Sequence, residues 1–302
     1  PALALGATLD FVGLRRGADI YRGIPAFGNL FDAPVASVLS GRIALGNAFF
    51  LQTLAVPTLG SNTPLWSLSN EFWYYVIFPL FVIVCVARVP RTARLGAAAA
   101  FGVLAVAIGW TIMRFFTVWL LGASLYFVFL WPAFHRLVGR YHLRWLATLW
   151  MFGALLVNRI HVIHPPIVSD LLFGSAVALW IGTLAVPNGD ACTRSAAYRS
   201  VAGWLAGFAY SLYLLHLPWL VFISTWIVPH HRLQPSSEAM TYFFAMAASA
   251  ILYAWLIASC TEYHTGAVRD RLSVWLFRKD RLTGGARVAN STERREDSPL
   301  AN

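Results

Sequence analysis

The chain contains a series of apolar runs long enough to cross a lipid bilayer, and this feature limits its fold more than any other. A transmembrane helix needs roughly 17–25 predominantly apolar residues. Seven runs reach or approach that length, at residues 71–87, 95–113, 115–131, 145–160, 167–186, 203–228 and 241–260. None alternates in hydropathy as a barrel strand does, so helices must satisfy the backbone inside the membrane. We therefore expect an all-α, polytopic integral membrane helix bundle with about seven full spans.

The charged residues support this class and predict an orientation. They make up only 12% of the 302 residues, whereas a soluble domain has about 25%. Of the 23 Lys and Arg residues, sixteen lie in the loops after the first, third and fifth runs and after the seventh run. Only Arg114, Arg159 and Arg232 lie in the alternate loops. This positive-inside pattern predicts a cytoplasmic C-terminus and argues against nucleic acid as the reason for the net charge of +10.

We predict one membrane domain over residues 1–283. Its first apolar run, which ends near Leu14, has about a dozen residues and is too short to span, so we expect the remaining part of a partial N-terminal helix. Residues 13–62 are rich in Gly, Pro, Asn and Arg, as is typical of an outer loop region. Residues 284–302 are polar and without periodicity, which predicts a disordered cytoplasmic tail.

One part of the outer loop region is ambiguous. Residues 43–59 are apolar but are interrupted by Asn47, Gln52 and Pro57. Such a segment is compatible with an interfacial or re-entrant arrangement, in which polar backbone is buried in protein. The alternative is that residues 43–59 cross the membrane fully. This would change only the side of the membrane on which the preceding residues lie.

Glu71 is the only acidic residue between positions 33 and 169. Ionisable groups inside a membrane are costly and usually face a bundle interior or a wet cavity. On a helix, Ser67, Glu71, Tyr74 and Tyr75 fall at i, i+4, i+7 and i+8, and so form one stripe. A carboxylate in that setting could exchange a proton.

The start of this helix is predicted at the outer surface. Asn62 or Thr63 can cap it, and Pro64 suits its first turn. The alternative to a functional role is an interfacial aromatic belt that includes Trp66 and Trp73. Glu71 would then simply be hydrogen-bonded at the interface.

A second polar group lies in the sequence AYSLYLLHLPW. Tyr210, Tyr213 and His216 recur at steps of three and therefore drift slowly around one side of a helix. Pro218 removes the hydrogen bond to the Leu214 carbonyl and opens the backbone beside His216. His216 could act as an acid or base, or it could be a hydrogen-bonded structural group.

Three further features carry weaker predictions. Arg114, at the outer edge of a predicted hairpin, could bind an anion or anchor at the headgroups. His161 and His164 lie in a short outer loop without a nearby carboxylate, and we expect no metal site. Glu262 ends the last apolar run and is most simply a paired group at the cytoplasmic surface.

Four stretches in order resemble a known family. They are NAFFLQTL (47–54), PLWSLSNEFWYYVIFPL (64–80), RFFTVWLLGASLYF (114–127) and FAYSLYLLHLPWL (208–220). Together they resemble the motifs of the acyltransferase 3 family of polytopic membrane O-acyltransferases. The resemblance extends from Pro1 to about Arg271.

The resemblance implies an enzyme of the bacterial inner membrane. Such an enzyme transfers an acyl group, commonly acetyl, from acyl-CoA to a hydroxyl of a carbohydrate or another cell-envelope molecule, with no permanently bound cofactor. Its expected catalytic residues here are Glu71 and His216. The expected substrate-binding residues are Ser67, Asn70, Tyr75, Arg114, Tyr210 and Tyr213.

The sequence also departs from the family pattern. The family begins with two further helices that carry a basic residue and the histidine usually given the central catalytic role. These would precede Pro1, so we expect either a fragment of a longer product or a degenerate member, inactive on its own. The alternative from a different class is a non-enzymatic transporter, flippase or sensor in which Glu71 and His216 form a proton relay.

Overall fold

The chain is helical throughout the part that the structure describes. This structure, a computed structural model, describes residues 1–17, 19–22, 31, 33–85, 87–140, 142–160, 165–186, 196–227 and 234–274. Within these ranges there is no β-strand, only one isolated bridge between Gln52 and Val56. The all-α prediction is confirmed. The predicted tail at 284–302 lies outside the described residues, as do His161 and His164.

Most of the helices coincide with the predicted apolar runs. They are α1 (Ala2–Arg15), α2 (Gly41–Ala48), α3 (Leu65–Cys85), α4 (Arg91–Phe129), α5 (Pro132–Arg140), α6 (Leu143–Arg159), α7 (Pro166–Ala185), α8 (Ala196–Ala206), α9 (Ala209–Ile227) and α10 (Ser237–Cys260). Short 3-10 turns lie at η1 (Asp19–Arg22), η3 (Val35–Val38) and η5 (Glu262–His264). Five helices in the described ranges are long and apolar enough to cross a membrane: α3, α4, α7, α9 and α10 with its continuation to Val274. A helical membrane bundle is therefore supported, but the count of seven spans is not.

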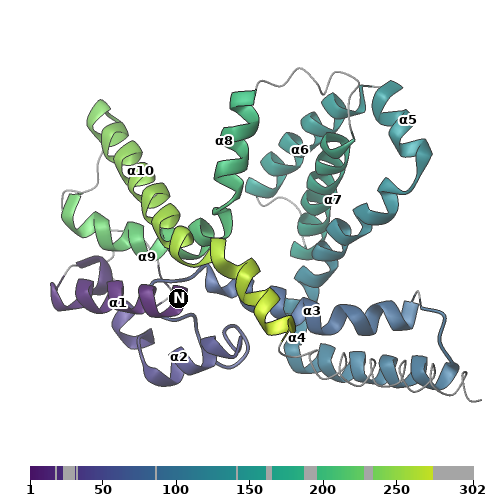
Figure 1. Cartoon of the computed structure of the whole chain (residues 1–302), viewed down its shortest axis with the longest axis horizontal. Coiled ribbons are helices and arrows are strands. Elements are labelled where there is room, and N and C mark those ends of the chain that lie inside the picture. The colour runs from purple at the N-terminus through teal and green to yellow at the C-terminus, as the bar shows by residue number, and fades with distance from the viewer. Residues whose placement is uncertain are drawn as a thin grey trace, which may run out of the picture.

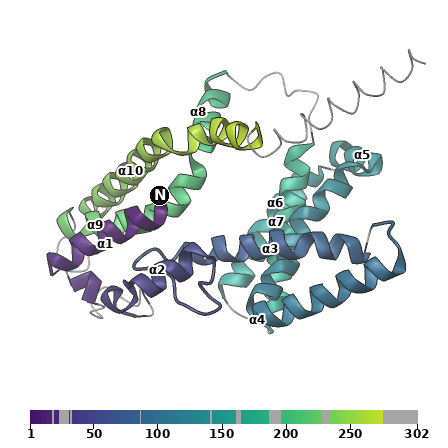
Figure 2. The same cartoon turned by 60° about the horizontal axis from the view of Figure 1, so that its bottom comes forward.

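The difference in count comes from α4 and α6. The predicted runs 95–113 and 115–131 form one helix of 39 residues, α4, which is not broken at Arg114. Its only non-helical residue is Gly109, with φ 78° and ψ 171°, and the helix changes direction there (Figures 1 and 2). The run 145–160 forms α6, which has only 17 residues.

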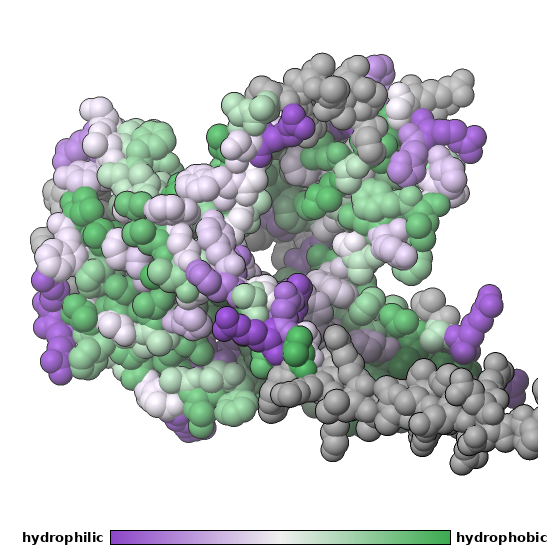
Figure 3. Space-filling model, in the orientation of Figure 1, coloured by the Kyte–Doolittle hydropathy of each residue, from purple (hydrophilic) through white to green (hydrophobic). Residues whose placement is uncertain are grey.

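The helices pack in three neighbouring groups. In the first, α1, α9 and α10 lie side by side (Figures 1 and 2), and Ala254 and Ala258 let α10 approach Phe208 closely. In the second, α3 runs against the first part of α4. In the third, the second part of α4 packs on α7, where a Cβ added at Gly174 would lie 2.7 Å from Val118. Apolar side chains cover much of the outer surface, and the molecule is hollowed between the first and third groups (Figure 3).

The segment before α3 folds back into the protein rather than crossing a membrane. Its helix α2 has only eight residues, too short to span. The polar residues that interrupt the apolar run satisfy the backbone: Asn47 Nδ2 donates to the Ile43 and Pro57 carbonyls, both at 2.9 Å. Gln52 Nε2 donates to the Leu65 carbonyl at 2.9 Å. Irregular backbone is tolerated inside a bundle when it is paired in this way, and the arrangement is compatible with the interfacial or re-entrant alternative for residues 43–59.

Candidate functional site

The N-terminal half of α3 presents most of the predicted stripe on one face. Ser67 Oγ donates to the Pro64 carbonyl at 3.0 Å. The Tyr75 hydroxyl donates to Glu71 Oε1 at 2.7 Å, one turn away on the same helix. Glu71 is half-buried and Tyr75 is exposed, so the carboxylate has one oxygen engaged by a phenol and remains accessible from the side of α9.

The first turns of α9 meet this face. Ser67 Oγ and the Tyr213 hydroxyl lie 2.7 Å apart; because Ser67 donates its one hydrogen to the Pro64 carbonyl, Tyr213 donates this hydrogen bond. The Tyr210 phenol lies close enough to interact electrostatically with Glu71 and with Tyr75. We call these residues the α3–α9 polar cluster: Ser67, Glu71, Tyr75, Tyr210 and Tyr213. The structure therefore joins side chains from two sequence motifs that are more than a hundred positions apart.

Two residues of α3 that were expected near the site face the other way. Asn70 is 3% exposed and Tyr74 is 6% exposed, and the Asn70 amide lies beside the Tyr74 phenol. Tyr74 packs against the rings of Phe116 and Trp119 on α4. Because α4 covers this side of α3, Asn70 and Tyr74 belong to the interface between the two helices, and the predicted place of Tyr74 on the stripe is wrong.

His216 is bonded to its own helix. Its Nδ1 lies 2.7 Å from the Tyr213 carbonyl and 3.1 Å from the Leu212 carbonyl. A nitrogen between two carbonyl oxygens must carry the proton, which leaves Nε2 as the acceptor. Among the described residues no hydrogen bond joins His216 to Glu71, so a direct relay between them is not formed.

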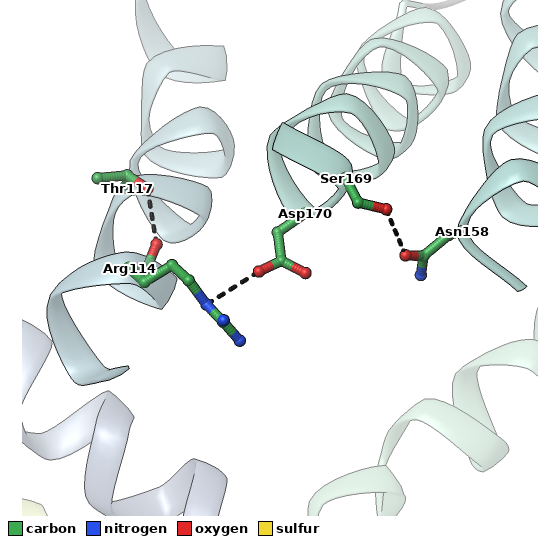
Figure 4. A network of polar contacts seen from close by, with 5 residues as sticks. All are labelled: Arg114, Thr117, Asn158, Ser169 and Asp170. Carbon is green, nitrogen blue, oxygen red and sulfur yellow. Dashed lines mark hydrogen bonds and ion pairs between the residues drawn. The ribbon is translucent and has the colours of Figure 1, made fainter. Parts of the chain in front are cut away.

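Arg114 lies away from the polar cluster, between α4 and α7 (Figure 4). Its Nε is 3.0 Å from Asp170 Oδ2, with the side chains 24% and 23% exposed. Beside this ion pair, Ser169 Oγ donates to Asn158 Oδ1 at 2.7 Å and so ties α7 to α6. We did not predict a partner for Arg114, although Asp170 was the next acidic residue after Glu71 in the sequence and could have been proposed.

Glu262 has no ion-pair partner among the described residues, and its contacts there are hydrogen bonds. Its Oε2 accepts hydrogen bonds from Ser211 N at 3.2 Å and from Ser211 Oγ at 2.6 Å. It therefore caps the first turn of α9 from the end of α10, which satisfies a helix N–H group that would otherwise lack a partner. Tyr210 also interacts electrostatically with Glu262. A cap from 51 residues away has no local signal in the sequence.

A cavity of about 440 Å³ opens beside the cluster, between the start of α1, the start of α9 and the end of α10. Its walls are mostly apolar and include Phe50, Leu65 and Leu214. Its polar lining includes Tyr210 and Ser211, and Glu262 is the one charged side chain among the lining residues. Tyr210 therefore belongs both to the cavity and to the polar cluster.

The start of α3 is buried by neighbouring segments of the protein. Leu65 is 1% exposed, and Ser61 just before it is fully buried. Asp10 of α1 accepts hydrogen bonds from both the N–H and the hydroxyl of Ser61. Neither side-chain polar atom of Asn62, a predicted cap, has a hydrogen-bond partner among the described residues. Contacts with α1, rather than a local cap, hold this end of the helix.

Burial affects one more group near Asp10. Tyr21, in η1, is completely buried, and its hydroxyl has no hydrogen-bond partner within the described ranges. Burial, and after it the negative charge of Asp10, raises the pKa of the Tyr21 phenol. The phenol therefore stays neutral and acts as part of the packing around α1.

Comparison of the sequence and the structure with protein-family models, curated proteins and solved structures gave no match. Among the described residues, no three His, Cys, Asp or Glu side chains are grouped so that they could hold a metal ion. The chemistry available at the site is that of one carboxylate, several phenols and a serine hydroxyl beside an apolar cavity. Such a set can bind and orient a hydroxyl-bearing molecule.

Proposed function

We propose that this chain is a membrane O-acyltransferase that resembles the acyltransferase 3 family. One observation carries the proposal: the two motif cores, WSLSNEFWYY on α3 and YSLYLLH on α9, meet through the hydrogen bond of 2.7 Å between Ser67 and Tyr213. Two stretches that resemble motifs of one family, and that lie far apart in the sequence, thus contribute to one site. A common site is what a shared catalytic role requires.

The proposed reaction moves an acyl group from a thioester to an alcohol. The acceptor oxygen attacks the carbonyl carbon of acyl-CoA, the new C–O bond forms, the C–S bond breaks, and the hydroxyl proton ends on the thiolate of CoA. The step needs a group that takes the proton and hydrogen-bond donors for the oxyanion of the tetrahedral intermediate. Carboxylate and phenol groups can supply both functions, and a carbohydrate offers several hydroxyls that they can bind.

We assign roles to the members of the site accordingly. Glu71 orients the acceptor hydroxyl or the base that deprotonates it, with Tyr75 fixing one of its oxygens. Tyr210 donates a hydrogen bond to the acceptor or the oxyanion, and Tyr213, which holds Ser67, accepts a hydrogen bond from the acceptor hydroxyl. His216 lies on the same helix as Tyr210 and Tyr213, is held through Nδ1 at the Tyr213 carbonyl, and is the second residue to which we assign a catalytic role. Arg114 and Asn70 support the packing of α4 on its neighbours.

The placement in the membrane is part of the proposal. At 1.5 Å per residue, α4 is roughly 58 Å long, about twice the hydrocarbon thickness of a bilayer, so we propose that it crosses twice with its bend at Gly109. The pattern of Lys and Arg residues in the loops supports a cytoplasmic C-terminus. The protein would lie in a bacterial inner membrane and take acetyl-CoA or another acyl-CoA from the cytoplasm.

A labelling assay tests the proposed activity. Membranes that contain the protein, expressed from its complete gene, are incubated with radiolabelled acetyl-CoA, and label is measured in the envelope polysaccharide fraction. Glu71→Gln should lower the transfer rate by about 100-fold or more, because it removes a charged group that acts on the transferred proton. Glu238→Gln, on the exposed first turn of α10, is the matched control and should transfer at the wild-type rate.

Two outcomes would contradict the proposal. Wild-type membranes that place no label in any envelope fraction would exclude acetyl transfer, and a transporter would then be the better reading. A Glu71→Gln variant that works within about twofold of wild type would remove Glu71 from the mechanism, because loss of general acid–base or orienting groups costs far more.

A further inference from the structure

One face of α1 docks the irregular segment that precedes α3. The buried residues of α1 are Gly6, Asp10 and Gly13, which follow one another at i, i+4 and i+7 and so share a face. A Cβ at Gly6 would lie 3.4 Å from Asn62 Nδ2, and a Cβ at Gly13 would lie 2.2 Å from the Tyr21 ring. The two glycines therefore make room for chain segments that pack directly on the helix, and Asp10 lies between them.

The Asp10 carboxylate binds both the backbone N–H and the side chain of Ser61. Its Oδ2 accepts from Ser61 N at 2.7 Å, and its Oδ1 accepts from Ser61 Oγ at 2.6 Å. Asp10 is fully buried, and no Lys or Arg in the described ranges forms an ion pair with it. Charge-assisted hydrogen bonds of this kind are short and directional. They offset the free-energy cost of burying the carboxylate.

Gly60 is required for this contact. Its φ is +61°, and a Cβ there would lie 2.0 Å from Asp10 Oδ2. The carboxylate therefore occupies the space that any side chain at position 60 would need. The sequence Gly60-Ser61 and the residue Asp10 thus form one built contact, although the partners are about fifty positions apart.

This contact lies directly ahead of the proposed site. Ser61 lies about one helical turn before Leu65, the residue at which α3 begins. Ser67 lies in the first turn of α3. A shift of Ser61 would carry Ser67 away from Tyr213, since their 2.7 Å hydrogen bond is the point at which the two motifs meet. Displacing a reacting or orienting group by about 1 Å can lower a rate by about 100-fold.

We infer that Asp10 is a positioning residue: by holding Gly60 and Ser61 inside the bundle it sets where α3 begins, and so places Ser67 and Glu71 opposite α9. The inference rests on the proposed function. Asp10 itself touches neither acceptor nor donor. Its effect passes through the backbone of residues 60–65.

Kinetics provide the first test. Asp10→Ala should lower kcat by about 100-fold and leave the KM for acetyl-CoA near the wild-type value, because a positioning residue that touches neither substrate acts on the reacting groups rather than on donor binding. Asp10→Asn keeps one oxygen to accept from Ser61 N and an amide to donate to Ser61 Oγ, so it should restore kcat to within about threefold of wild type. The pH–rate profile of Asp10→Asn should match that of wild type. Thr8→Ala, on the exposed face of α1, is the control.

A second measurement does not depend on activity. Ser67→Cys and Tyr213→Cys are introduced after Cys85, Cys192 and Cys260 have been replaced by serine, and a short bifunctional thiol reagent links the new pair. Asp10→Ala should reduce the yield of this cross-link, and Asp10→Asn should restore it, while circular dichroism and gel filtration show that each variant is folded.

The outcomes separate the two proposals. A cross-link that is unchanged in a folded Asp10→Ala variant overturns the positioning role. Equal loss of kcat in Asp10→Ala and Asp10→Asn with normal cross-linking also overturns it, because the charge would then act directly. A cross-link lost in Asp10→Ala and restored in Asp10→Asn supports positioning, even if wild-type membranes transfer no acetyl group and the proposed function fails.

Discussion

Replacing Gly109 by alanine tests the bend in α4. Gly109 has φ 78° and ψ 171°, a backbone conformation found almost only in glycine, which costs another residue on the order of 1–3 kcal/mol. No atom lies within 4 Å of the position that a Cβ at residue 109 would take. The whole cost of Gly109→Ala should therefore come from the backbone and none from a clash. We expect the free energy of unfolding to fall by that amount.

Gly102→Ala in the same helix is the matched control. A Cβ at Gly102 also has no atom within 4 Å, but its backbone is helical, so alanine should stabilise the helix by about 0.5–1 kcal/mol. The two variants should thus differ by about 1.5–4 kcal/mol, or about tenfold to several hundredfold in the folding equilibrium.

The assay is equilibrium unfolding in mixed micelles, in which SDS is titrated into the protein in a mild detergent and helix content is followed by circular dichroism. Both variants are measured against wild type under the same conditions. If Gly109→Ala proves as stable as Gly102→Ala, the backbone at residue 109 is helical and α4 is not bent there. The proposed double crossing of α4 would then lose its structural basis.

Two further pairs of variants can be measured by the same unfolding assay. Ser67→Ala and Tyr213→Phe remove the same hydrogen bond, so the double variant should lose no more than one single variant, about 0.5–1.5 kcal/mol; additive losses would show that the two hydroxyls are not bonded. Arg114→Gln and Asp170→Asn should each cost about 1.5–3 kcal/mol, because each leaves a half-buried charge without its partner at 3.0 Å. The double variant should be more stable than the sum of the two losses implies, and full additivity would exclude the ion pair.

The positions of the long helices could be predicted from the sequence, because each depends on a continuous apolar run. The facing of Ser67, Glu71 and Tyr75 could also be predicted, since helical periodicity alone determines which side chains share a face. The continuity of α4 could not. An arginine in the middle of an apolar stretch indicates a loop, unless a partner such as Asp170 on another helix lets it remain inside the bundle.

The buried start of α3 was missed for a similar reason. Asn62, Thr63 and Pro64 are local signals for a helix that begins at a surface, and they predict such a start for α3. Asp10 overrides them from 51 residues away by pairing the backbone of Ser61 inside the protein. The cap on α9 by Glu262 is likewise a tertiary contact, which periodicity and composition do not encode.

The hydrogen bond between Ser67 and Tyr213 also has a consequence for biosynthesis. Its partners are 146 residues apart, so at 5–20 residues per second the ribosome needs about 7–30 s after Ser67 before Tyr213 is made. The Asp10 contact is available much earlier, since both of its partners precede α3. During the interval α1 and Gln52, which donates to the Leu65 carbonyl, can hold the start of α3 while α4 to α7 enter the translocation machinery. Premature termination anywhere in that interval would release a chain with an exposed, half-assembled site, which is the kind of product that membrane quality control removes.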